Sequence, residues 1–105
     1  MEEVIQITTT ADNKETVERI GMSLVEKKLA ACIQILGPIK SVYRWKGNVE
    51  NAEEWLCLIK SKTSLYKEIE TDILRLHPYE LPEITVTDVI GGLAGYIRWV
   101  EDETR

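Results

Sequence analysis

The chain opens with a pattern that alternates between two faces and then changes to a helical period. Residues 4–10 are almost all β-branched, with Ile5 and Ile7 on one face, which predicts a first strand. Asp12 and Glu15 have the spacing of a capping box, so we expect Asp12 to cap a helix. The apolar positions of that helix recur along one face, as in an amphipathic helix that packs on a sheet. They are Val17, Ile20, Leu24, Val25 and Leu29.

A long extended region follows this helix. Residues 31–36 predict a second strand, which Gly37-Pro38 interrupts with a bulge or bend, because proline cannot donate to a strand ladder. Residues 39–46 continue extended to Gly47-Asn48, a pair typical of a hairpin turn. The return strand spans residues 49–62. The region therefore predicts one long β-hairpin in the middle of the chain.

The remainder predicts a second helix, a fourth strand and a third helix. Ser64 is a candidate cap for the second helix, which is followed by a loop at 77–83 that two prolines stiffen. Residues 84–90 alternate as a strand, and residues 93–100 have helical spacing. The order β-α-β-β-α-β plus a C-terminal helix predicts an α+β, ferredoxin-like single domain over residues 1–105, with two helices on one face of a four-stranded antiparallel sheet.

The central hairpin is too long for one domain of this size. Its return arm would reach roughly 45 Å at ~3.3 Å per residue, whereas a compact chain of this length has a radius of gyration of only ~13 Å. With Gly47-Asn48 as the turn, Tyr43 faces Ala52, and Tyr43, Trp45 and Trp55 share one side of the ribbon. We expect this aromatic ribbon to project and pack on another copy of the chain. The alternative is that it curls at Gly37-Pro38 and folds back on its own sheet.

The same register separates the two cysteines. Cys57 is expected opposite Pro38 and Cys32 opposite Thr63, which excludes an internal disulfide. Two cysteines and the acidic start Met1-Glu2-Glu3 predict a cytoplasmic protein.

The composition limits the classes of molecule that the chain is expected to bind. The 105 residues include 13 Lys and Arg against 18 Asp and Glu, a net charge of −5, which disfavours nucleic acid and anionic membranes as partners. Basic Arg44, Lys46 and Lys60 lie among the hairpin aromatics, but subunit packing explains them better than base stacking. All aromatic residues are Trp or Tyr, with no Phe, and such polar-tipped rings favour interfaces.

The loop that carries the only histidine is the candidate chemical site. His77 is followed by Tyr79, Glu80 and Glu83, and an imidazole with carboxylates can bind a divalent cation or act as an acid–base pair. The alternative is an ordinary connecting loop whose histidine caps the preceding helix. The chain has no recognisable catalytic motif, and Thr8-Thr9-Thr10 lacks the arginine-containing anion cradle that an acylphosphatase-like hydrolase needs. We therefore expect no enzymatic activity.

Four segments resemble the CutA divalent-cation tolerance family, in order and over essentially the whole chain. They are LVEKKLAAC at 24–32, YRWKG at 43–47, LHPYELPE at 76–83 and YIRWV at 96–100. The resemblance implies a ferredoxin-like protomer in a tight homotrimer, similar to PII signalling proteins, whose hairpins reach neighbouring subunits. It also implies a role in tolerance of copper and other divalent metals.

The resemblance further implies where a ligand binds. His77 matches the family histidine proposed as a copper ligand, and Glu83, Cys32 or residues of another subunit are the candidates to complete a site for copper or another divalent cation. Some bacterial relatives carry a second histidine and a cysteine where this chain has Leu76 and Thr9. The expected cleft lies between subunits, beside residues of the loop and the hairpin. These are Tyr43, Trp45, Trp55, Lys60 and Tyr79. The alternative is a PII-like signalling or scaffold trimer that binds a metabolite or a protein and has no direct metal role.

Overall fold

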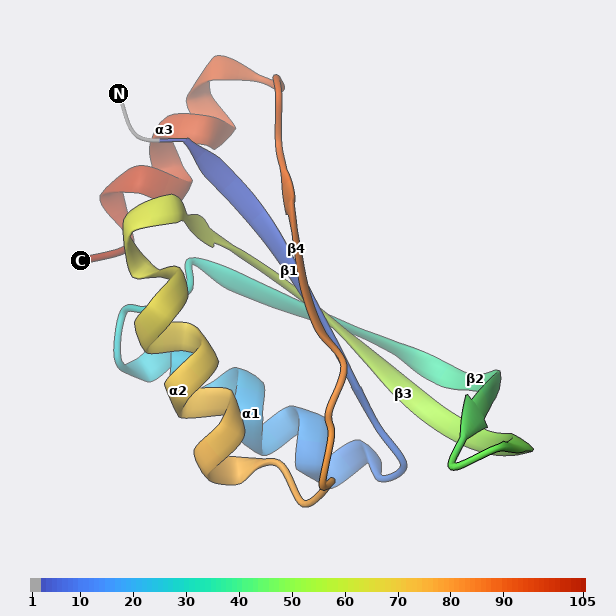
Figure 1. Cartoon of the computed structure of the whole chain (residues 1–105). Coiled ribbons are helices and arrows are strands. Elements are labelled where there is room, and N and C mark those ends of the chain that lie inside the picture. Colours follow the sequence, from blue (N-terminus) through green and yellow to red (C-terminus); the bar gives the residue numbers. More distant parts are fainter. Residues whose placement is uncertain (1–2) are drawn as a thin grey trace.

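The strands and α-helices follow one another in the order that the sequence predicts. The computed structural model describes residues 3–105; Met1 and Glu2, which belong to the acidic start, lie outside the described residues. The elements are β1 (Val4–Ala11), α1 (Lys14–Glu26), β2 (Cys32–Trp45), β3 (Asn48–Lys62), a 3₁₀ turn (Thr63–Leu65), α2 (Tyr66–Leu76), β4 (Ile84–Asp88) and α3 (Ala94–Asp102) (Figure 1). The predicted α+β, ferredoxin-like order with an extra C-terminal helix is confirmed.

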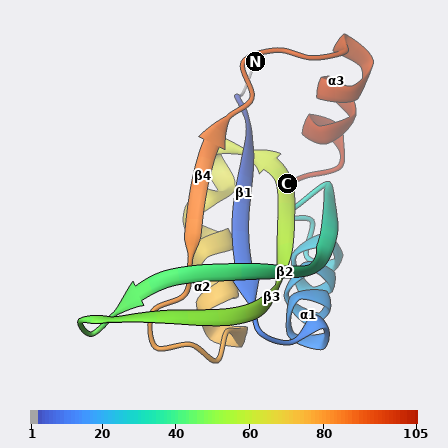
Figure 2. The same cartoon turned by 90° about the vertical axis from the view of Figure 1, so that its right-hand side faces the viewer.

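The four strands form one antiparallel sheet in the order β2-β3-β1-β4. Helices α1 and α2 cover one face of this sheet, and Figure 2 shows the opposite face, which these two helices leave uncovered. The core lies between helices and sheet, where Ile7 of β1 and Ile59 of β3 pair side by side and are fully buried. Helix α3 lies at the end of the sheet where β1 begins, and Lys62 of β3 donates to its Glu101 carbonyl.

The hairpin turn differs from the prediction by one residue. Lys46 and Gly47 form the turn, because Trp45 pairs with Asn48, and both turn residues have a positive φ, of 50° and 84°. Positive φ at both central positions is the geometry of the turn that matches the twist of a hairpin. Tyr43 therefore faces Glu50 and not Ala52.

This shift corrects the predicted aromatic side of the ribbon. A register change of one residue reverses the faces, since side chains alternate along a strand. Tyr43 and Trp45 lie on the side that carries Glu54, whereas Trp55 follows Glu54 directly and lies on the opposite side. The prediction that all three aromatics share one side was wrong.

The predicted bend at Gly37-Pro38 is present. The register shifts between Leu36 and Ile39, and a Cβ on Gly37 would lie 2.5 Å from Cε3 of Trp55. Beyond this bend the hairpin turns across the sheet, and its tip extends past β4 in Figure 2. The chain is consequently elongated, with a longest extent of 44 Å.

The observed register also changes the predicted partners of the cysteines, and the cap of α1 differs from the prediction as well. Cys57 lies opposite Ile35 rather than Pro38, and Cys32 opposite Lys60 rather than Thr63; both thiols are free. Asn13, not Asp12, caps α1, because its side-chain oxygen accepts the N–H of Glu15 at 2.8 Å.

Helix α2 starts after the 3₁₀ turn, with Leu65 and not Ser64 at its N-cap position. Among the described residues, no helix is long and apolar enough to span a membrane.

Candidate functional site

His77 lies where α2 ends and contacts the end of β1. Its backbone N–H donates to Ile73, and its ring is almost buried, with 9% exposed. Nε2 lies 2.7 Å from the Thr10 carbonyl oxygen, and Nδ1 accepts the backbone N–H of Tyr79 at 3.2 Å. Because a carbonyl only accepts and an N–H only donates, Nε2 is the donor to Thr10 and Nδ1 is the acceptor from Tyr79. Both ring nitrogens are therefore engaged by the main chain.

Tyr79 links this loop to the base of the hairpin. Its ring meets the ring of His77 edge-on, with centroids 4.7 Å apart, and its hydroxyl donates to Glu54 Oε2 at 2.8 Å. Burial, the acceptor carboxylate of Glu54 and the nearby charge of Asp12 raise the pKa of Tyr79 well above 10, and Tyr43 adds to the shift. The phenol thus stays protonated and holds the carboxylate of Glu54, which is only 6% exposed.

Of the predicted site residues, the structure brings together His77, Tyr79 and the hairpin side that carries Tyr43 and Trp45. The Nζ atom of Lys46 lies over the ring of the preceding residue, Trp45, at 5.5 Å from the ring centroid. Lys46 also forms an exposed ion pair of 3.8 Å with Glu80 of the loop.

The other predicted residues lie elsewhere. Trp55 packs against the core, with Lys14 Nζ 5.3 Å from its ring centroid. Lys60 lies further along β3 and approaches Gln34 at 3.4 Å. Glu83 is exposed and makes no hydrogen bond or ion pair with any described residue. Within one chain, these three do not join His77.

Sequence reasoning missed Glu54 as the partner of Tyr79. A signal was present, because Glu54 has the same strand parity as Leu56 and Leu58, and a carboxylate among apolar positions needs a partner. The contact between His77 and Thr10 has no such signal in the sequence, because the acceptor is the backbone carbonyl of Thr10.

The residues of one chain do not fit a metal ion at His77. A ligating imidazole must offer a free lone pair, whereas here one nitrogen donates and the other accepts. Over residues 3–105, no group of three or more His, Cys, Asp or Glu side chains is placed to hold a metal. Cys32, another candidate ligand, contacts the Tyr96 hydroxyl at 3.4 Å on a different part of the sheet.

These features define a ferredoxin-like α+β protein with a long, bent β-hairpin tied to the loop after its second helix. The family described as CutA1 divalent ion tolerance protein matches residues 5–103. The chain belongs to this family.

Individual relatives agree with the family. The divalent-cation tolerance protein CutA of Thermus thermophilus is 36% identical over 104 residues, which span 99% of both chains. A solved structure of the divalent cation tolerance protein from the same organism superimposes with a TM-score of 0.93, at 35% identity and 100% coverage of both chains. A structure from Archaeoglobus fulgidus, described as a periplasmic divalent cation tolerance protein, has a TM-score of 0.92 at 34% identity, covering 95% of this chain and 97% of that one.

Some relatives are longer. The chloroplastic protein CutA of Arabidopsis thaliana is 35% identical over 101 residues, which are 96% of this chain but only 56% of the relative. The chain thus spans about half the length of that curated relative.

Proposed function

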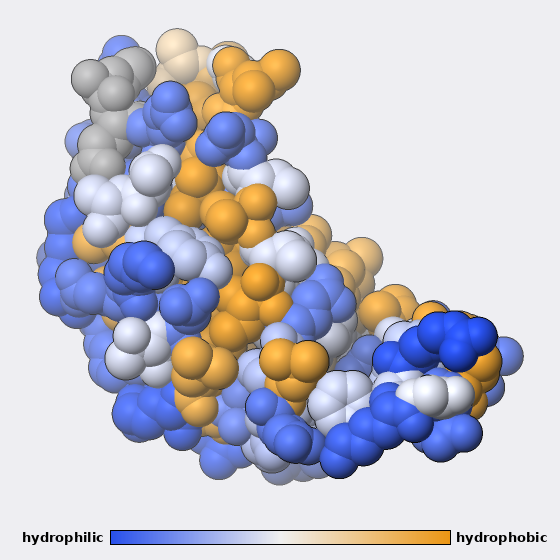
Figure 3. Space-filling model, in the orientation of Figure 1, coloured by the Kyte–Doolittle hydropathy of each residue, from blue (hydrophilic) through white to orange (hydrophobic). Residues whose placement is uncertain are grey.

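We propose that this chain forms a homotrimer that serves divalent-cation tolerance, with its ligand in clefts between subunits. The observation that carries the proposal is the exposure of apolar side chains on the hairpin, where Val42 and Val49 are each 60% exposed. Ile90, after β4, is 100% exposed. Figure 3 shows apolar residues along the sheet and on the hairpin, on the inner side of the bend between them. Contiguous exposed apolar surface of this kind marks a protein interface.

Sedimentation tests the assembly. The trimer should have about three times the 12.0 kDa of one chain. Val42→Asp should shift it toward the single chain, because the charge enters an apolar contact. Val25→Asp on α1 is the matched control, since Val25 is exposed on the helix layer, and it should leave the trimer intact. A wild-type mass near 12.0 kDa would refute the trimer.

We propose that a divalent cation, such as copper, binds in the cleft through Glu83, with ligands from a second subunit. Support comes from the family and from the exposed, unpaired carboxylate of Glu83. Calorimetric titration with copper and zinc should show saturable binding that Glu83→Gln weakens. Binding that is the same in the wild type and in Glu83→Gln contradicts this role.

A second candidate is a PII-like trimer that binds a metabolite or a protein and has no direct metal role. The engagement of both His77 nitrogens favours it, since metal binding there would break a hydrogen bond of 2.7 Å to Thr10 or that from Tyr79. This candidate predicts no saturable heat with either metal. Protection of the hairpin from hydrogen exchange by a metal-free ligand extract would support it.

We further propose that the protein is cytoplasmic and has no catalytic activity. Both described thiols are free, which suits a reducing compartment. Cell fractionation tests the cytoplasmic location. An activity assay with acyl phosphates tests the lack of catalysis, and turnover of these substrates would contradict it.

A further inference from the structure

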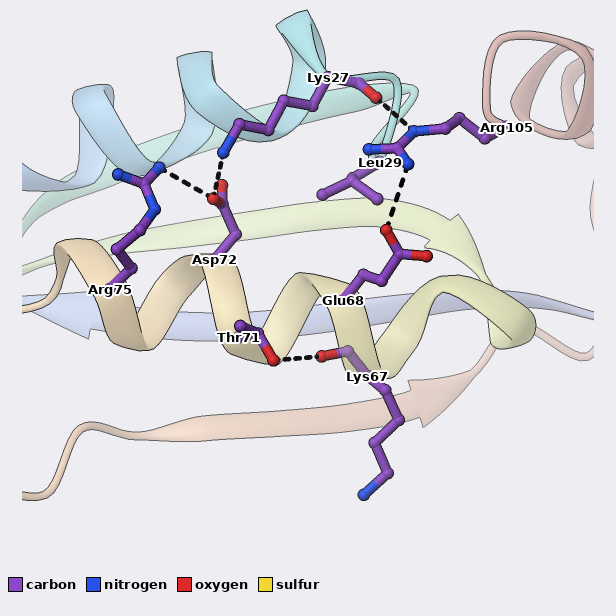
Figure 4. Close-up of a pocket in the computed structure, with 8 residues that line it drawn as sticks. All are labelled: Lys27, Leu29, Lys67, Glu68, Thr71, Asp72, Arg75 and Arg105. Atoms are coloured by element: carbon purple, nitrogen blue, oxygen red, sulfur yellow. Dashed lines mark hydrogen bonds and ion pairs between the residues drawn. The ribbon is translucent and has the colours of Figure 1, made fainter.

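A charged hollow of about 430 Å³ lies between the end of α1, one side of α2 and the C-terminal segment (Figure 4). It belongs to the helix layer, away from the hairpin and from the proposed subunit clefts. Six charged residues line it: Lys27, Lys67, Arg75, Arg105, Glu68 and Asp72. Lys27, Arg75 and Arg105 extend toward Glu68 and Asp72, whereas the side chain of Lys67 points away from them (Figure 4). Three cations therefore meet two carboxylates in a chain whose net charge is −5.

The carboxylate of Asp72 is fully occupied by donors around it. Lys27 Nζ donates to Oδ1, Arg75 Nη2 donates to the same oxygen at 2.9 Å, and Ser23 donates to Oδ2 at 2.7 Å. Burial alone would raise the pKa of Asp72, but these hydrogen bonds, led by that of Lys27, lower it below 3.8. Asp72 therefore stays ionised and fixes Lys27 and Arg75 at the wall of the hollow.

Arg105 is held by two hydrogen bonds of its guanidinium, although its side chain is 49% exposed. Its Nε donates to the Lys27 carbonyl at 2.8 Å, and its Nη1 donates to Glu68 at 3.2 Å. Its Nη2 has no partner among the described residues. The guanidinium thus presents an unused donor edge whose orientation is already set, which is the group that recognises carboxylate and phosphate oxygens.

We propose that this hollow binds a small oxyanion, with Arg105 as its anchor. Glu68 and Asp72 balance two of the three cations that extend toward each other here, Lys27, Arg75 and Arg105, so an anion completes the balance. The volume lies within the range of small-molecule sites. Phosphate esters and polycarboxylates share this chemistry, and the hollow offers both the same donors. The site does not depend on the proposed trimer or on a metal ion.

The test is calorimetric titration of the full chain at low ionic strength with inorganic phosphate, pyrophosphate and citrate. We expect one anion per chain with a Kd of about 0.1–1 mM, and weaker binding as salt screens the charges. The anion that binds most tightly shows whether the ligand is a phosphate ester or a polycarboxylate. An absence of saturable binding for all three anions at about 10 mM overturns the proposal.

Two variants separate this site from general electrostatic attraction. Glu68→Gln should tighten binding about three-fold or more, because it frees Arg105 from its competing carboxylate. Glu18→Gln, an exposed α1 residue outside the hollow, changes the net charge equally and should leave the Kd unchanged. Arg105→Gln should weaken binding about ten-fold, whereas Arg44→Gln on the hairpin should not. Equal effects of Glu68→Gln and Glu18→Gln, or of Arg105→Gln and Arg44→Gln, overturn the proposal. A gain of affinity in Glu68→Gln cannot arise from misfolding.

Discussion

Replacing Gly37 by alanine should destabilise the bend of the hairpin, because a methyl group has no room there. The added Cβ would lie 2.5 Å from Cε3 and 2.7 Å from Cδ2 of Trp55, and 3.2 Å from its Cα. Carbon atoms in contact normally stand about 3.5–4.0 Å apart, so the overlap with the ring is about 1 Å. Gly37 does not have a positive φ, so the cost is steric and not conformational.

The size of the effect follows from how little Trp55 can move. Its ring packs against the core, Lys14 lies over it, and its Cα belongs to the central strand β3. Forcing a methyl group into such a packed site costs about 1–3 kcal/mol. For a domain of this size, each kcal/mol lowers the Tm by about 4–8 °C.

A double-mutant cycle followed by urea unfolding measures this coupling. In the Trp55→Ala background, Gly37→Ala should cost less than about 0.5 kcal/mol, because the clashing ring is gone. Gly91→Ala is the matched control, since a Cβ there meets no atom within 4 Å. An equal cost of Gly37→Ala in both backgrounds, or no cost in the wild type, would refute the steric reasoning.

Three further predictions concern single side chains. Tyr79→Phe should cost about 1–2 kcal/mol in urea unfolding, because the nearly buried carboxylate of Glu54 loses its phenol donor. The folded pKa of Tyr79 is raised above 10.0, so its contribution is complete below pH 10 and is lost above it; the stability of Tyr79→Phe should therefore fall less steeply above pH 10. The pKa of Asp72 is lowered from 3.8, so its contribution to stability is present above pH 3.8 and is lost as the pH falls through the pKa of the folded state. Asp72→Asn should therefore be less stable than the wild type at pH 7 in urea unfolding, and this difference in stability should disappear in acid. Gly95→Ala should raise stability by about 0.5–1 kcal/mol in thermal unfolding, because Gly95 lies inside α3 and an added Cβ meets no atom within 4 Å; a loss of stability would contradict this.

The sequence pattern was sufficient for the fold and insufficient for the hairpin register. Period and punctuation located the four strands and three α-helices of the described residues but not the 3₁₀ turn, since burial on one face imposes alternation or helical spacing. The turn was ambiguous because Gly47 can occupy either central position, and the choice of Lys46-Gly47 over Gly47-Asn48 depends on pairing along the whole ribbon. That single residue decided the side on which Trp55 lies.

Pattern alone was also insufficient for the candidate site. The Tyr79–Glu54 hydrogen bond joins residues 25 positions apart, on the loop after α2 and on strand β3. The Thr10 carbonyl that meets His77 is 67 positions away and carries no side-chain signature. Local sequence could nominate His77 and Tyr79, but their partners depend on the tertiary fold.

These contacts give the His77-Pro78-Tyr79 segment a structural role that requires no metal. His77 ties the end of α2 to the end of β1, and Tyr79 ties the same loop to the base of the hairpin through Glu54. Loss of Tyr79 would therefore remove a contact with the hairpin, which is the element proposed to contact neighbouring subunits, and loss of His77 would free the loop that carries Tyr79. A reduced metal response in a His77 variant would consequently not identify His77 as a ligand, whereas the exposed Glu83 can be changed without disturbing any of these hydrogen bonds. Glu83 is for this reason the residue at which direct metal binding and structural support can be told apart.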